Sequence, residues 1–137
     1  MGTTTTTHAE GTFKPESWDE GPYAEVEGAP KLTRARVTSS YDGDLQGKGT
    51  AESLMFYRDG ANATYVGYER IEGSLGGRSG SFVLEGTGSF EGGVARTTWQ
   101  VVPGSGTGDL EGLRGEGGYD APSGEAAVPY RLDYDFD

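Results

Sequence analysis

The stretch from Thr64 to Gly108 constrains the fold of this 137-residue chain more than any other part of it. It contains three long segments in which β-branched and aromatic residues recur without a helical repeat. Glycine-rich turns at Ser74–Gly80 and Glu91–Gly93 separate these segments. Because short turns join antiparallel neighbours, the stretch predicts a three-stranded β-meander.

Five further strands are expected around this meander. The clearest covers the last residues of the chain, where Val, Tyr, Leu and Phe alternate with Pro, Arg and Asp. Asp59 and Gly60 give a strong hairpin signal between another of these strands and the first strand of the meander, and Asp19–Pro22 is predicted to form a turn. The predicted strands cover Gly11–Trp18, Leu32–Tyr41, Gly49–Arg58, Ala63–Gly73, Ser79–Phe90, Val94–Pro103, Leu113–Asp120 and Val128–Phe136.

About eight strands with short turns and no helical periodicity indicate an all-β fold. Strand spacing alone allows an antiparallel up-and-down β-barrel or a β-sandwich. Glycines within the predicted strands favour the barrel, because the strands of a small barrel bend sharply where side chains are absent. These glycines are Gly67, Gly73, Gly86, Gly88, Gly115 and Gly117. We therefore expect residues 11–137 to form a single β-barrel domain after a mobile N-terminal tail at residues 1–10.

The composition excludes several kinds of site and partner. The chain has no cysteine, which excludes disulfides, thiolate nucleophiles and cysteine-ligated zinc. Its net charge of −11 argues against nucleic acid and acidic membrane surfaces as partners, because both attract basic proteins. It has neither an apolar run that would cross a bilayer nor a signal-peptide pattern, so we expect a cytoplasmic protein. The only histidine, His8, lies in the expected tail and is no catalytic candidate.

Two glycine-containing motifs do not predict a metal or cofactor site. Asp42–Gly47 resembles the start of a calcium-binding loop, but Ser53 stands where a bidentate glutamate is required. Gly104–Gly108 matches no nucleotide-binding pattern, and no helix is predicted after it. We therefore expect no metal and no cofactor.

Glu69 is the candidate catalytic residue. Counting alternate positions along its strand places it on the same face as Tyr65 and Ile71. If that face lines the barrel interior, desolvation raises the pKa of the carboxyl and suits it to proton transfer. Glu52 is a second, weaker candidate. The alternative for Glu69 is an ion pair that only stabilises the barrel, with Arg78, Arg96 or Arg114 as the partner.

A binding site for a small apolar substrate is expected around Glu69. The faces of the neighbouring strands that share its side of the sheet carry mainly apolar and aromatic residues. Tyr57 and Tyr119 are also compatible with an ordinary core position, as buried tyrosines usually are. The candidate substrate-binding residues are Tyr65, Phe82, Leu84, Gly86, Thr97, Trp99, Met55, Tyr57 and Tyr119.

Four segments carry a resemblance to a known family: Leu75–Leu84, Gly92–Trp99, Val102–Glu116 and Asp133–Phe136. Over roughly residues 11–137 the chain resembles the DUF3224 family, and this resemblance implies a bacterial protein. It also implies a barrel similar to those of the allene oxide cyclase-like proteins, which include cyclases and isomerases that fold an apolar substrate in the lumen. The family tends to have Gln-His where this chain has Glu and Gly86, so the resemblance implies a missing inward histidine and a larger lumen here.

Three functions are compatible with these features. The first is a small-molecule enzyme, cyclase-like or isomerase-like, that binds an apolar substrate in the lumen and transfers a proton through Glu69. The second is a non-catalytic, lipocalin-like carrier of a small hydrophobic ligand. The third is a packed barrel without a ligand site. A homo-oligomer is compatible with all three.

Overall fold

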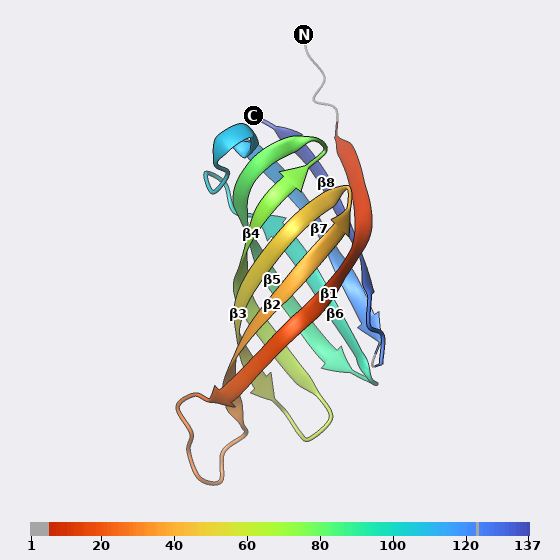
Figure 1. The fold of residues 1–137 in the computed structure, drawn as a ribbon. Coiled ribbons are helices and arrows are strands. Elements are labelled where there is room, and N and C mark those ends of the chain that lie inside the picture. Colours follow the sequence, from red (N-terminus) through yellow and green to blue (C-terminus); the bar gives the residue numbers. More distant parts are fainter. Residues whose placement is uncertain (1–5, 123) are drawn as a thin grey trace.

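The structure, a computed structural model, describes residues 6–122 and 124–137. Eight antiparallel strands pair in chain order, and β8 pairs with β1 to close a barrel (Figure 1). This confirms the predicted up-and-down barrel and rules out the sandwich. Among the described residues no helix is long and apolar enough to cross a membrane, and the one helical element is the short 3₁₀ turn η1 (Gly108–Leu110). The strands are β1 (Thr7–Pro22), β2 (Leu32–Gly43), β3 (Leu45–Tyr57), β4 (Ala63–Leu75), β5 (Arg78–Glu91), β6 (Val94–Val101), β7 (Leu113–Pro122) and β8 (Val128–Phe136).

The first strand is longer at both ends than the sequence predicts. Residues 7–13 pair with β8, and Ala9 is buried, so the assignment of residues 7–10 to a mobile tail is wrong. Residues 1–5 of that expected tail lie outside the described residues. Asp19–Pro22 pairs with β2 and continues the strand instead of forming a turn. The extra length has a physical reason, because β1 must give a partner to both β2 and β8 to leave no open edge.

One pair of glycines shows why a small barrel needs residues without side chains. Gly47 in β3 lies opposite Gly73 in β4. A Cβ atom at Gly73 would lie 1.9 Å from the backbone oxygen of Gln46, and one at Gly47 would lie 2.1 Å from that of Glu72. Only glycine lets the two backbones approach so closely at this bend.

The end of the barrel that carries η1 (Figure 1) is packed with fully buried side chains. The connection between β6 and β7 folds against β5, where the Thr107 amide donates to the Ser81 carbonyl at 2.8 Å. This contact places Leu110 of η1 in the interior, where it is fully buried. The loop after β1 and the hairpin turn after β3 lie at the opposite end. The fully buried large side chains of the closed end are Leu45, Ile71, Leu75, Phe82, Leu110, Leu113 and Leu132.

A layer of aromatic rings separates the packed end from the other end. The distances between neighbouring ring centroids in this layer run from 4.9 Å, between Phe13 and Tyr119, to 6.4 Å, between Tyr41 and Trp99. The rings meet in tilted and edge-on arrangements, which aromatic quadrupoles prefer. The members of this layer are Phe13, Tyr41, Trp99, Tyr119 and Tyr130.

Candidate functional site

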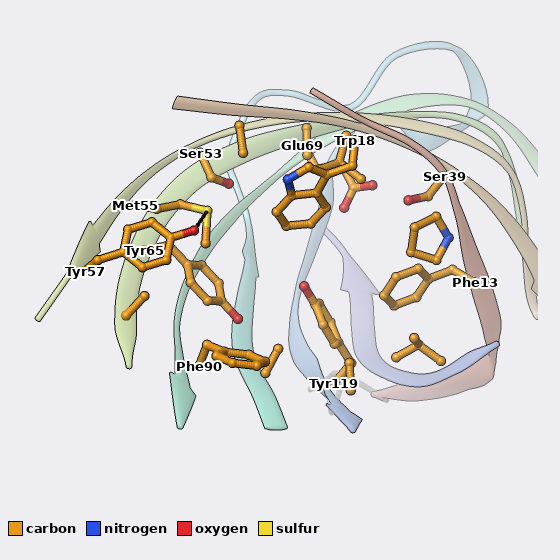
Figure 2. Close-up of a pocket in the computed structure, with 18 of the residues that line it drawn as sticks. Phe13, Trp18, Ser39, Ser53, Met55, Tyr57, Tyr65, Glu69, Phe90 and Tyr119 are labelled. Atoms are coloured by element: carbon orange, nitrogen blue, oxygen red, sulfur yellow. Dashed lines mark hydrogen bonds between the residues drawn. The ribbon is translucent and has the colours of Figure 1, made fainter. Parts of the chain in front are cut away.

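The half of the barrel away from η1 holds a cavity of about 360 Å³ (Figure 2). Its size lies in the usual range for small-molecule sites. The space exists because six of the lining residues are alanines, whose side chains are too short to fill the lumen. Large apolar side chains form much of the remaining wall. The lining residues include Phe13, Pro15, Trp18, Ala35, Val37, Ala51, Ala61, Ala63, Phe90, Ala95, Ala121 and Val128.

The inner faces of β4, β5 and β6 follow the alternation expected from the sequence. Ile71, Leu84 and Trp99 are buried, and Tyr65 and Glu69 line the cavity. Because the strands are paired in register from β4 through β6, side chains at alternate positions must share one face. The predicted shared interior is therefore present.

Glu69 lies at the floor of the cavity, and its carboxyl touches the cavity while protein surrounds it elsewhere. The hydroxyl of Tyr41 donates a hydrogen bond to its Oε1 atom at 2.8 Å. Burial raises the pKa of Glu69 to about 7, and the hydrogen bond from Tyr41 lowers it only in part. A carboxyl with such a pKa exchanges its proton readily near neutral pH.

The alternative of an ion pair for Glu69 is wrong. Within the part of the chain that the structure describes, Glu69 takes part in no salt bridge. Arg114 pairs with carboxylates of the C-terminal strand, and Arg78 lies over the ring of Phe136, 4.1 Å from its centroid. Arg96 alternates with inward residues of β6 and is exposed. None of the described basic residues therefore balances the charge of the Glu69 carboxyl.

Tyr41 and Glu69 can form a hydrogen bond because the strand between theirs carries a glycine. Tyr41 belongs to β2 and Glu69 to β4, and Gly49 lies on β3 between the two. A Cβ atom at Gly49 would lie 2.2 Å from Oε2 of Glu69 and 2.9 Å from Cε1 of Tyr41. The sequence did not lead us to Tyr41 or Gly49. Continuing the alternation of β2 by one step would have placed Tyr41 on the inner face.

Three hydroxyl groups form a second polar cluster beside Glu69. The Tyr65 hydroxyl and Oγ1 of Thr97 are 2.6 Å apart, and the Tyr119 side chain lies beside both. Gly88 lies between the strands of Tyr65 and Thr97, where a Cβ atom would lie 2.6 Å from the Tyr65 ring. Burial, followed by the effect of Tyr65, raises the pKa of Tyr119, so this hydroxyl stays protonated. We call Tyr65, Thr97 and Tyr119 the hydroxyl cluster.

A small recess of about 50 Å³ adjoins the main cavity at this cluster. It shares Tyr65, Glu69 and Tyr119 with the cavity. A Cβ atom at Gly86 would lie 3.4 Å from both Thr97 and Trp99, which is ordinary contact. The absent side chain at this position therefore leaves room in the lumen, as the family resemblance implied. The recess is further lined by Ala51, Ser53, Gly67, Tyr68, Leu84, Gly86, Thr97 and Trp99.

The rim of the cavity is held by a glutamate that accepts three hydrogen bonds. Glu20 receives them from Thr33 Oγ1 at 2.6 Å, from the Tyr57 hydroxyl at 2.5 Å and from Trp18 Nε1 at 3.0 Å. Burial alone would raise the pKa of Glu20, but these hydrogen bonds lower it. Burial and the bond to Glu20 raise the pKa of Tyr57 to about 12. Trp18 lines the cavity and is 58% exposed (Figure 2).

Most of the predicted site residues lie around one space. Met55, Tyr57, Tyr65 and Tyr119 line the cavity with Glu69, and Leu84, Gly86, Thr97 and Trp99 line the recess. Phe82 is the exception among the predicted substrate-binding residues. It is fully buried in the closed end, opposite Ile71, and lines neither space. Glu52 points outward, 3.8 Å from Arg36, and is excluded as a second inward carboxyl.

The lining residues of β1 could not be assigned from the sequence. The cavity is lined by three residues of β1: Phe13, Pro15 and Trp18. Strict alternation from Phe13 and Pro15 would have pointed Trp18 outward. The pairing of β1 with β2 shifts between Pro15 and Ser17, so one extra residue enters the strand there. Such a bulge reverses which residues face inward beyond it.

The fold and the cavity together define an eight-stranded antiparallel β-barrel that is packed at one end and hollow at the other. The chain belongs to the DUF3224 family, described as proteins of unknown function, whose profile matches residues 9–134. It is similar to a DUF3224 protein of unknown function from Shewanella oneidensis MR-1, whose crystal structure is known. The two are 30% identical, with a TM-score of 0.78, over 97% of this chain and 99% of that one. No curated protein matches the chain.

Proposed function

We propose that the protein is a small-molecule enzyme that binds an apolar substrate in the cavity and transfers a proton through Glu69, in the manner of a cyclase or an isomerase. One observation carries this proposal: a carboxyl that has no basic partner among the described residues lies at the floor of a mainly apolar cavity. Burying such a group destabilises a fold, and perturbed carboxyls of this kind concentrate at functional sites. A structural role is disfavoured because the expected arginine partner is missing.

The shape of the cavity supports proton transfer within it. A substrate in the lumen would be shielded from water by the aromatic layer below and by Trp18 at the rim. Exclusion of water strengthens the interactions of the carboxyl with the substrate, and tight walls hold the reacting atoms close to it.

The second candidate is a non-catalytic carrier of a small hydrophobic ligand. It is favoured by the many aromatic and alanine side chains of the wall and by the lack of histidine and cysteine there. The cavity argues against the third candidate, a packed barrel without a ligand site.

Ligand-observed NMR with a panel of apolar small molecules tests whether the cavity binds ligands. We expect binding to the wild type and its loss in Ala51→Leu, because Ala51 lines both the cavity and the recess. Thr50→Leu is the matched control, since the alternation of β3 directs this neighbour outward. Equal binding by the two variants would place the ligand outside the lumen.

Conversion of the bound ligands separates the enzyme from the carrier. We expect Glu69→Gln to bind these ligands and to convert none of them, whereas the wild type converts at least one. Glu72→Gln, on the exposed face of the same strand, is the control and should behave as the wild type. A wild type that binds ligands and leaves every one of them unchanged supports the carrier.

A further inference from the structure

We propose that the substrate is a neutral carbonyl compound with an apolar body, whose oxygen is held by the hydroxyl cluster while Glu69 removes a proton from the adjacent carbon. This inference rests on the proposed function and assigns a substrate class and a reaction to the same site. The observation behind it is that a proton acceptor and a group of hydrogen-bond donors line the same floor.

Both polar groups reach one space. Tyr65, Glu69 and Tyr119 each line the main cavity and the recess, and Figure 2 shows all three side chains directed into the lumen. They come from β4 and β7, two strands that are not neighbours in the barrel. A molecule at the junction of cavity and recess therefore has the carboxyl and the hydroxyl cluster within its reach.

Glu69 has a free oxygen for the substrate. Oε1 accepts the hydrogen bond from Tyr41, whereas Oε2 accepts none from the described residues. No buried side-chain oxygen or nitrogen of those residues lacks a partner, so Oε2 is open to the cavity. Tyr41 is thereby a positioning residue that holds one oxygen and orients the other.

The hydroxyl cluster has a hydrogen atom to donate. Each hydroxyl carries one hydrogen and two lone pairs. The hydrogen bond between Tyr65 and Thr97 uses one of the three hydrogens. The cluster therefore keeps a hydrogen for an acceptor in the lumen, and a carbonyl oxygen is such an acceptor. The Tyr65 hydroxyl also lies 3.4 Å from the carbonyl oxygen of Arg96, which is a weaker protein acceptor at that distance.

The charge of the site selects a neutral substrate. Glu69 is the one Asp, Glu, Lys or Arg side chain among the described residues that line the cavity and the recess. A carboxylate or phosphate ligand would find no cation there and would be repelled by Glu69. An ammonium group would match Glu69 but would leave the donors of the hydroxyl cluster unused. A ketone or an aldehyde matches both polar groups.

The reaction is a proton shift without any co-reactant. Glu69 Oε2 takes the proton from the carbon next to the carbonyl. The C–H electron pair forms a C=C bond, and the carbonyl π pair moves to the oxygen, which becomes an enolate oxygen. The hydroxyl cluster stabilises this negative charge by hydrogen bonds that strengthen as the charge develops. Glu69, now a carboxylic acid, returns the proton to the same carbon or to another carbon of the conjugated system.

Hydrogen–deuterium exchange of 2-tetralone in D₂O tests this inference. This bicyclic ketone is apolar and neutral, and its protons next to the carbonyl are followed by ¹H NMR. We expect the wild type and Glu72→Gln to exchange them at least tenfold faster than an equal concentration of Glu69→Gln. Tyr119→Phe should lower the rate about 100-fold, which is typical when one donor to a developing oxyanion is removed. Thr97→Val provides a second variant of the hydroxyl cluster that keeps the side-chain shape.

The outcomes separate this inference from the proposed function. Naphthalene, which has no carbonyl, serves as the probe for binding alone. Binding of naphthalene without accelerated exchange of 2-tetralone overturns the carbonyl assignment and leaves the proposed function standing. Exchange that persists in both folded variants, Tyr119→Phe and Thr97→Val, overturns the role of the hydroxyl cluster. A wild type that binds neither probe overturns both proposals.

Discussion

The closed and open ends of this barrel are built from the same strands but differ in the size of their inward side chains. Inward positions of β4 and β5 near η1 carry Ile71 and Phe82, which are fully buried. Nearer the other end, Ala63 of β4 lies opposite Phe90 of β5 and both line the cavity. One end thus buries apolar surface and stabilises the fold, and the other leaves room for a ligand.

The polar residues of the site lie where these two ends meet. Glu69 and the hydroxyl cluster lie at the floor of the cavity, against the aromatic layer. The packed end holds this floor rigid, so the polar groups keep their positions without a ligand. The residues that stabilise the fold and those of the candidate binding site are thus separated along the barrel axis.

Large-to-small substitutions at the two ends should give the largest difference. Phe82→Ala should lower the free energy of unfolding by about 3–5 kcal/mol, because a cavity forms in a packed core. Trp99→Ala should have a cost of the same size. Phe90→Ala should lower it by about 1–2 kcal/mol, because Phe90 is only half-buried and already borders empty space. Urea unfolding measures the free energy of unfolding of all three variants. Equal losses for the Phe82 and Phe90 variants would show that the two ends are packed equally well.

The pH dependence of stability should reveal the buried carboxyl. The folded-state pKa of Glu69 is about 7, above the value of about 4.5 for an exposed glutamate, so the folded chain holds an extra proton between these values. Stability should therefore be greatest below the lower pKa and fall by about 3 kcal/mol as the pH rises through the higher one.

Comparison of the wild type with Glu69→Gln isolates this component. The variant lacks the titration, so its free energy of unfolding should rise by about 3 kcal/mol relative to the wild type between pH 4.5 and 8. The side chain that hydrogen-bonds Glu69 is Tyr41, which stays neutral over this range because burial and Glu69 raise its pKa. Parallel curves for the two proteins would show that the carboxyl of Glu69 is solvated.

Two glycine-to-alanine substitutions test how much space the floor of the cavity leaves for a side chain. Gly49→Ala should lower the free energy of unfolding by about 1–3 kcal/mol, because the new methyl group meets Glu69 and Tyr41 and pushes them apart. Loss of their hydrogen bond should appear as a changed pKa of Glu69 in an NMR titration of its carboxyl. An unchanged pKa and stability would mean that Gly49 is not needed for this contact.

Gly86→Ala is the matched substitution with the smallest expected effect. Its methyl group finds ordinary contact distances, so the free energy of unfolding should change by less than about 1 kcal/mol. The methyl group enters the recess, and ligands that place a substituent there should bind more weakly, whereas ligands confined to the main cavity should be unaffected. Equal binding of both kinds would show that the recess is not used.

Much of the fold was predictable because alternation is a local property of a strand. The boundaries of β8 were predicted to the residue, and the inner faces of β4, β5 and β6 followed from counting alternate positions. Glu69 was placed inward by the same count. The bulge between Pro15 and Ser17 was not predictable, since it depends on how β1 pairs with β2.

The sequence by itself determined the class of fold, the number of strands and the inward carboxyl, because each depends on residues close together in the chain. Only the tertiary structure decided what surrounds that carboxyl. Tyr41 reaches Glu69 across a third strand at Gly49, and no arginine of the described residues pairs with Glu69. The burial of Leu110 by η1 was likewise decided only by the fold. Such contacts depend on barrel closure, which brings residues far apart in sequence into register.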